Sequence, residues 1–70
     1  MPKNVETAVK LMEQACEFGM SHGCYLAGGG YYYGSGVAVD KDKALELFVR
    51  ACEDGVEGAC AMVDSMHGTE

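Results

Sequence analysis

Four cysteines carry the most reactive groups of this 70-residue chain, and they form two pairs with the same spacing. Cys16 and Cys24 stand eight positions apart, and so do Cys52 and Cys60. One interpretation is two structural disulfides, and the other is a zinc site in which Cys16, Cys24 and His22 are ligands. Zinc sites favour shorter ligand spacings such as Cys-x-x-Cys, so the spacing favours disulfides and predicts no metal or other cofactor.

The remaining groups that could do chemistry do not form a recognisable catalytic set. His22 and His67 have no nucleophile at a spacing typical of a nucleophile and its base, so both are expected to face solvent. The acidic cluster within residues 53–57 is typical of a solvated turn. Gly28–Gly30 lacks the Lys-Ser/Thr of a phosphate-binding loop. We therefore predict no catalytic residues.

The elements that position the cysteines repeat along the chain. A shift of 36 positions superimposes identical residues: Ala8 on Ala44, Leu11 on Leu47, Ala15–Glu17 on Ala51–Glu53, Gly19 on Gly55, and Cys24 on Cys60. A fixed offset of this kind indicates a tandem repeat. We expect one domain over residues 1–70, with repeat units at about 4–36 and 40–67.

Apolar residues at spacings of three and four predict an all-α chain in which each repeat is a helical hairpin. The predicted helices span residues 5–18, 22–33, 41–54 and 58–66. Asp40 and Ser21 are expected to cap the N-termini of two of them. Gly19 and Gly55 are expected to end the first and third helices in a left-handed conformation.

The second predicted helix contains a run of three glycines, Gly28 to Gly30. Each interior glycine costs roughly 1 kcal/mol relative to alanine. Tertiary packing must therefore hold this helix, and close approach of a neighbouring backbone is the expected benefit. We predict that alanine clashes at Gly28 and that it is neutral or stabilising at Gly29 or Gly30.

Composition and charge exclude several functions. The formal net charge of −6 disfavours binding to nucleic acids and to anionic membranes. No apolar run approaches membrane-spanning length, and no signal peptide follows Met1. Disulfides predict an exported protein, periplasmic or secreted, whereas Met1 as the native start would predict a cytoplasmic one.

The segment between the second and third predicted helices, together with those two helices, carries the residue pattern of a known family. The residues that match it in order and spacing are Gly28, Tyr31, Gly34, Gly36, Val37, Asp40, Lys43 and Ala44. The chain resembles the Sel1-like repeat proteins, relatives of the tetratricopeptide repeats, over about residues 4–66. The cysteines are similar to those of the Helicobacter cysteine-rich proteins, a subgroup that closes each repeat with a disulfide. That resemblance implies the pairs Cys16–Cys24 and Cys52–Cys60.

The resemblance implies two stacked antiparallel hairpins, an α/α solenoid that presents a concave face to a protein or peptide partner. The first and third helices would line this face, and the candidate contacts there are Glu13, Glu17, Glu46 and Arg50. One alternative is the penicillin-binding or weak β-lactamase activity associated with some cysteine-rich members, although Ser-x-x-Lys is missing. The other is a small acidic intracellular inhibitor that blocks a basic surface.

Three tyrosines follow the glycine run. Tyr31 occupies the core position of the family and is expected to be buried. Neighbouring residues on a helix point about 100° apart, so at least one of Tyr32 and Tyr33 should be exposed and could contact a partner.

The fourth predicted helix carries Met62, Val63 and Met66 at helical spacing. With no third repeat to cover them, we expect an exposed apolar patch there. Methionines suit an adaptable interface, so Met62 and Met66 are candidate contacts and a two-fold homodimer through the C-terminal helices is expected.

Overall fold

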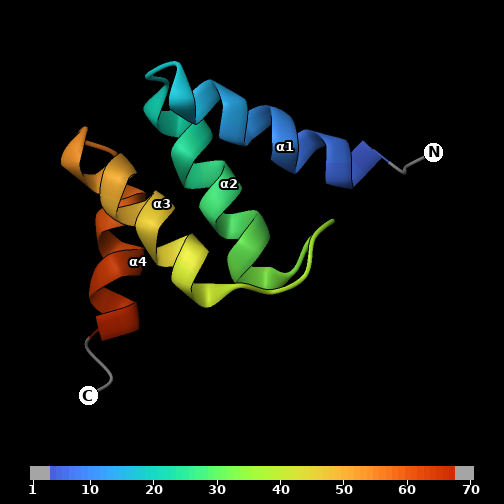
Figure 1. The fold of residues 1–70 in the computed structure, drawn as a ribbon. Helices are drawn as coiled ribbons and strands as arrows, with labels where there is room; N and C mark the ends of the chain where they lie inside the picture. Colours follow the sequence, from blue (N-terminus) through green and yellow to red (C-terminus); the bar gives the residue numbers. More distant parts are fainter. Residues whose placement is uncertain (1–3, 68–70) are drawn as a thin grey trace.

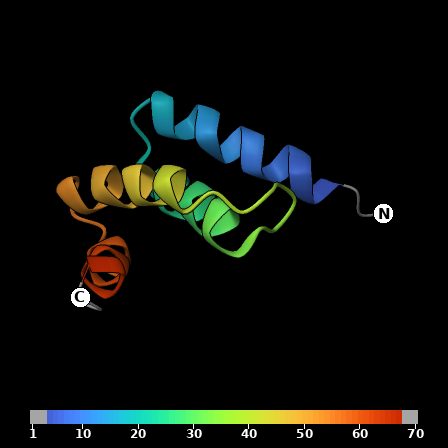
Figure 2. The same ribbon diagram turned by 60° about the horizontal axis from the view of Figure 1, so that its bottom comes forward.

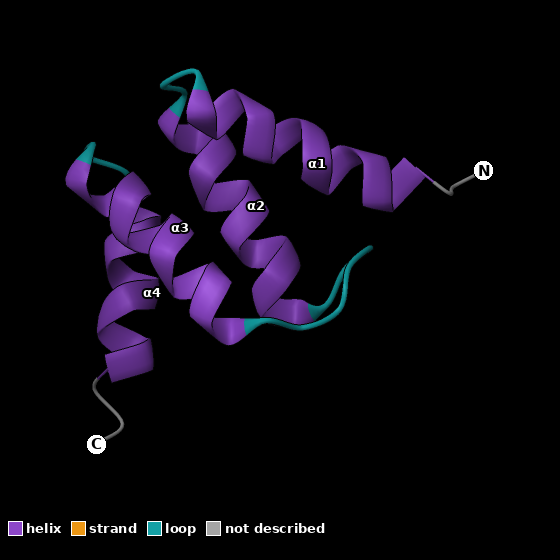
Figure 3. Ribbon diagram, in the orientation of Figure 1, coloured by secondary structure: helices purple, strands orange, loops and turns teal. Residues whose placement is uncertain are grey.

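A computed structural model describes residues 4–67 of the chain, and these residues form four helices joined by short loops (Figures 1 and 3). The helices are α1 (Asn4–Glu17), α2 (Ser21–Tyr33), α3 (Lys41–Glu53) and α4 (Glu57–His67). Each boundary lies within one residue of its predicted position. The all-α prediction is therefore confirmed over the described residues.

The helices stack in the order of the sequence. α2 packs against both α1 and α3, and α3 packs against both α2 and α4. Figure 2 shows α1 and α4 at opposite edges of the molecule, with the other two helices between them. The two middle helices are thus covered on two sides and the two outer helices on one.

The predicted helix ends are confirmed at three of four positions. Asp40 has an extended backbone, and its Oδ1 accepts a hydrogen bond of 3.1 Å from the Lys43 N–H. Gly19 and Gly55 have φ values of 95° and 101°, a conformation that glycine adopts without strain. The Ser21 cap is wrong, because Ser21 is already helical and the extended residue before α2 is Met20, without a side-chain cap.

The core forms where the two repeats meet. Its buried members are Cys16, Cys24, Ala27, Ala44, Leu47, Phe48, Ala51 and Ala59. Four of them are alanines without any exposed surface, so the helices approach closely with little side chain between them. Phe48 is the largest fully buried side chain and supplies most of the bulk at this junction.

Two glycines of the run in α2 lie in close contact with neighbouring helices. A Cβ on Gly28 would lie 2.9 Å from Cε1 of Phe48, as the predicted clash requires. A Cβ on Gly29 would meet no atom within 4 Å. The expectation for Gly30 is wrong, because a Cβ there would lie 2.7 Å from Cγ2 of Val9. α1 crosses α2 at this point, and sequence periodicity does not reveal where two helices cross.

Candidate partner-binding surface

Each repeat contains one disulfide between consecutive helices. Cys16 and Cys24 join α1 to α2, and Cys52 and Cys60 join α3 to α4, each with a Cα–Cα distance of 4.6 Å. The predicted pairing is therefore present, and no thiolate is left for zinc. The first disulfide is buried, with Cys16 3% and Cys24 1% exposed, whereas both cysteines of the second are partly buried.

The four charged candidates from the sequence come together. Glu13 and Glu17 from α1 and Glu46 and Arg50 from α3 line one hollow of about 100 Å³. Its other lining residues are Cys16, Lys43 and Leu47. We call this surface the α1–α3 hollow. Both repeats contribute to it, as the prediction of a shared face requires.

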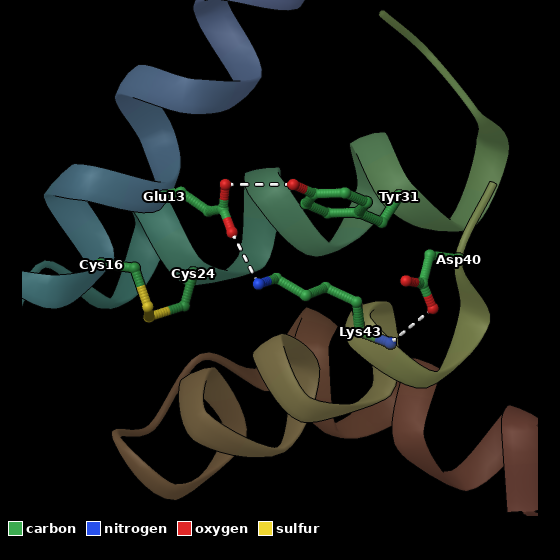
Figure 4. A network of polar contacts seen from close by, with 6 residues as sticks. All are labelled: Glu13, Cys16, Cys24, Tyr31, Asp40 and Lys43. Atoms are coloured by element: carbon green, nitrogen blue, oxygen red, sulfur yellow. Dashed lines mark hydrogen bonds and ion pairs between the residues drawn. A yellow bond between two sulfur atoms is a disulfide. The ribbon is translucent and has the colours of Figure 1, made fainter. Parts of the chain in front are cut away.

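Glu13 connects three helices within this hollow (Figure 4). The Tyr31 hydroxyl of α2 donates a hydrogen bond of 3.0 Å to Glu13 Oε1. The Lys43 Nζ of α3 forms an ion pair of 3.1 Å with Glu13 Oε2 and lies 5.7 Å from the Tyr31 ring centroid. Glu13 is thus occupied by internal partners, which leaves Glu17, Glu46 and Arg50 as the charged groups available to a ligand.

The network also shifts the pKa values of Tyr31 and Lys43. Burial, followed by the hydrogen bond to Glu13 and the charge of that carboxylate, raises the pKa of Tyr31 above its ordinary value. The hydrogen bond to Glu13 and its charge raise the pKa of Lys43. Near neutral pH, Tyr31 is therefore a neutral hydrogen-bond donor and Lys43 is a cation.

The family pattern places Tyr31 in the core, and the sequence carries no signal of its polar contact with Glu13. Tyr31 is partly buried rather than buried, because its hydroxyl reaches the edge of the α1–α3 hollow. Lys43 was known only as part of the family pattern. Its pairing with a residue 30 positions earlier has no signal in one sequence.

The aromatic and methionine candidates lie on two other surfaces. Tyr33 is 70% exposed and lines a mostly apolar hollow of about 160 Å³ with Met62. Tyr32 is partly buried and lines a hollow of about 400 Å³ with Met66. The ring of Tyr32 lies against Phe48, at 6.3 Å between centroids, and Lys41 Nζ stands 5.0 Å from it. The eight candidate contacts therefore divide among three surfaces.

The apolar residues of α4 are neither free nor fully covered. Met62, Val63 and Met66 are partly buried and pack against the core, because α4 turns its apolar side toward α3. The exposed large apolar side chains of the described residues are Leu11, Phe18, Met20, Leu26, Tyr33 and Val39. All of them precede α3, so the structure gives a homodimer through the C-terminal helices no support.

His22 and His67 are exposed, as predicted. No helix among residues 4–67 has the length and apolar character needed to cross a membrane. Within the same residues, no three side chains of histidine, cysteine, aspartate or glutamate gather in a way that could hold a metal ion.

The helical fold agrees with a comparison of the chain with known families. The Sel1 repeat family matches residues 1–19 and 21–56, which is more than half of the chain. Searches of curated proteins and of solved structures found no match. Sel1 repeats generally mediate protein–protein interaction. The chain belongs to the Sel1 repeat family.

Proposed function

We propose that the protein is a binding module for a protein or peptide partner and that the α1–α3 hollow is its contact surface. The observation that carries this proposal is the convergence of both repeats on one surface with exposed charged side chains. Glu17, Glu46 and Arg50 are exposed around the hollow, and the buried Leu47 forms part of its apolar lining. Charged groups around an apolar centre are typical of protein interfaces.

The size of the hollow supports a macromolecular partner. Pockets for small molecules have volumes of roughly 300–1,000 Å³. The α1–α3 hollow, at about 100 Å³, is closer to the space that a single side chain fills. We infer that one partner side chain enters it while the rest of the partner lies over α1 and α3.

The charges favour a basic partner segment. Lys43 is neutralised by Glu13, so Glu17 and Glu46 outnumber Arg50 among the remaining charges of the hollow. The whole chain carries a net charge of −6, which attracts cations from a distance. We propose a peptide with Lys or Arg beside an apolar anchor residue.

We further infer membership of the Helicobacter cysteine-rich subgroup and residence in an oxidising compartment. The two disulfides with eight-residue separation support both inferences. Under reducing conditions the hollow would lose a constraint at Cys16, which lines it. Binding should therefore be measured with the oxidised protein.

A random peptide library displayed on phage, selected against the oxidised chain, tests the proposed surface. We expect enriched peptides with basic and apolar residues, whose affinity falls at least tenfold when Glu17 and Glu46 are both changed to lysine. The matched control changes Glu57 and Asp64 to lysine, which are exposed on α4 and produce the same net charge. An equal loss of affinity in the two variants would mean that overall charge, and not this surface, causes the effect. Peptides that bind the Glu17/Glu46 variant with unchanged affinity would contradict the proposed surface.

A further inference from the structure

The two disulfides have the same place in their hairpins but differ in burial. In each, the first cysteine is the next-to-last residue of one helix and the second is the fourth residue of the next helix. The two closed loops have equal length. Cys16 and Cys24 are buried, whereas Cys52 and Cys60 are partly exposed to solvent. The first disulfide is therefore a matched control for the reactivity of the second.

Burial controls thiol–disulfide exchange, because an attacking thiolate must contact a sulfur of the bond. Cys16 and Cys24 belong to the core where the repeats meet, so a reagent reaches them only after this core has opened. Cys52 borders the same core as a partly buried residue, and Cys60 is partly buried as well. A reductant therefore has access to the second disulfide while the protein stays folded.

The charges around the second disulfide select among reductants. Glu53, Asp54 and Glu57 are exposed in the turn that this disulfide closes. The positions that match Asp54 and Glu57 in the first repeat are occupied by Phe18 and Ser21. Exposed charges are screened by salt and have small effects, so they do not outweigh the burial of the first disulfide. They do slow the approach of thiols that carry additional negative charge.

The second disulfide holds a helix with few other constraints. α4 has 11 residues, and an isolated helix of this length is not stable in water. It packs against α3 at the edge of the stack (Figure 2), and Ala59 is the only residue of α4 that is fully buried. Without the disulfide, α4 would keep only the packing of its partly buried apolar side chains.

The α1–α3 hollow does not involve α4. All of its lining residues belong to α1 and α3, and the contacts of Glu13 join these two helices to α2. The hollows that include Met62 and Met66, in contrast, have a wall formed by α4. Loss of the second disulfide would therefore change one end of the molecule and leave the α1–α3 hollow in place.

We propose that the Cys52–Cys60 disulfide is a site of reversible reduction by a dithiol without additional negative charge. Its opening releases α4, while the first disulfide stays closed and the α1–α3 hollow is retained. The inference does not depend on the proposed function, because it concerns the opposite end of the stack.

The reaction is an exchange in two steps. A thiolate of the dithiol attacks one sulfur of the disulfide and forms a mixed disulfide with it, while the Sγ–Sγ bond breaks and the other cysteine leaves as a thiolate that takes up a proton. The second thiolate of the dithiol then attacks the dithiol's own sulfur in the mixed disulfide. This step closes the oxidised dithiol and frees the remaining cysteine, which also takes up a proton. Two electrons and two protons thus pass from the dithiol to Cys52 and Cys60.

Timed alkylation tests the order of reduction. The oxidised protein is treated with dithiothreitol, samples are quenched with N-ethylmaleimide, and peptide mass spectrometry gives the labelled fraction of each cysteine. We expect Cys52 and Cys60 to be labelled initially at least roughly tenfold faster than Cys16 and Cys24. Equal initial rates, or faster labelling of the first pair, would overturn the proposal.

The same assay at low and high ionic strength tests the role of charge. Glutathione carries more negative charge than dithiothreitol, so salt should raise its initial rate at Cys52 and Cys60 by a factor about twofold larger than the factor for dithiothreitol. The same salt effect for both reagents would overturn the proposed preference among reductants.

Backbone chemical shifts test the release of α4. In a variant with Cys52→Ala and Cys60→Ala, the Cα shifts of α4 should lose at least about half of their helical displacement, because the helix is too short to be stable alone. The shifts of α1, α2 and α3 should keep their helical values. Full helical shifts in α4 would overturn its release, and coil shifts in all four helices would overturn the retention of the α1–α3 hollow.

Discussion

The second helices of the two repeats, α2 and α4, occupy the same place in their hairpins but differ in their surroundings. α2 lies between α1 and α3 and buries Gly23, Gly28 and Gly30. α4 packs against α3 at the edge of the molecule, and its only fully buried described residue is Ala59. The glycines thus occur where a helix must accept neighbours on two sides.

A comparison of positions 36 residues apart shows which residues differ between α2 and α4. Gly28 corresponds to Asp64, and Gly30 corresponds to Met66. Gly28 meets the ring of Phe48, whereas Asp64 is exposed to solvent. Position in the stack therefore explains a glycine run that helix propensity opposes.

The largest expected difference between the repeats concerns the disulfides. Replacing Cys16 and Cys24 by alanine should lower the free energy of unfolding by roughly 2–4 kcal/mol. The matching change of Cys52 and Cys60 should cost less, because the two loops have equal length and only the first pair is buried. Urea unfolding of the two double variants checks this order, and an equal or reversed order would remove burial as the cause of the difference.

The next effect concerns neighbouring glycines of α2. Gly28→Ala should destabilise the protein by roughly 1–2 kcal/mol, because the added methyl overlaps Phe48. Gly29→Ala is the matched control and should stabilise it by up to about 1 kcal/mol, because its methyl meets no atom within 4 Å. Chemical denaturation midpoints measure both changes. A higher midpoint for Gly28→Ala would contradict the packing explanation for α2.

The smallest effect concerns the polar network that joins the two repeats. Tyr31 and Lys43 have raised pKa values in the folded state, so their stabilising contribution is complete below about pH 10. It is lost as the pH rises through these raised values. Glu13→Gln removes the carboxylate that contributes to both shifts and should make stability depend less on pH above about 10.

The control for this pH profile is Glu17→Gln, which removes a carboxylate from the same hollow that contributes to neither shift. Thermal unfolding at short incubation times, in steps of pH, gives the profile of each variant. Identical profiles for Glu13→Gln and the natural protein would show that the network does not contribute to alkaline stability.

Local features of the fold could be predicted from the sequence because they depend on nearby residues. The Asp40 cap involves an amide three positions away, and Gly55 ends α3 by its own backbone conformation. The pairing of the cysteines could be predicted for the same reason, since each disulfide closes one turn between consecutive helices. The 36-residue offset then extended each local prediction to the other repeat.

Features that depend on helix crossings could not be predicted. Ser21 was expected to cap α2, but its hydroxyl instead binds a residue 33 positions later in the other repeat. Gly30 was expected to tolerate alanine, but it lies against Val9 where α1 crosses α2. The extent to which the apolar side of α4 is covered could not be predicted, because periodicity shows that a side is apolar without showing which neighbour covers it.

A double-mutant cycle between Gly28 and Phe48 tests most directly whether close packing explains the glycine run of α2. Phe48→Leu shortens the side chain that lies 2.9 Å from a Cβ on Gly28. We predict that Gly28→Ala costs at least about 1 kcal/mol less in the Phe48→Leu background than in the natural protein. The same cost in both backgrounds would contradict the account, because the penalty of the methyl would then not arise from contact between α2 and α3.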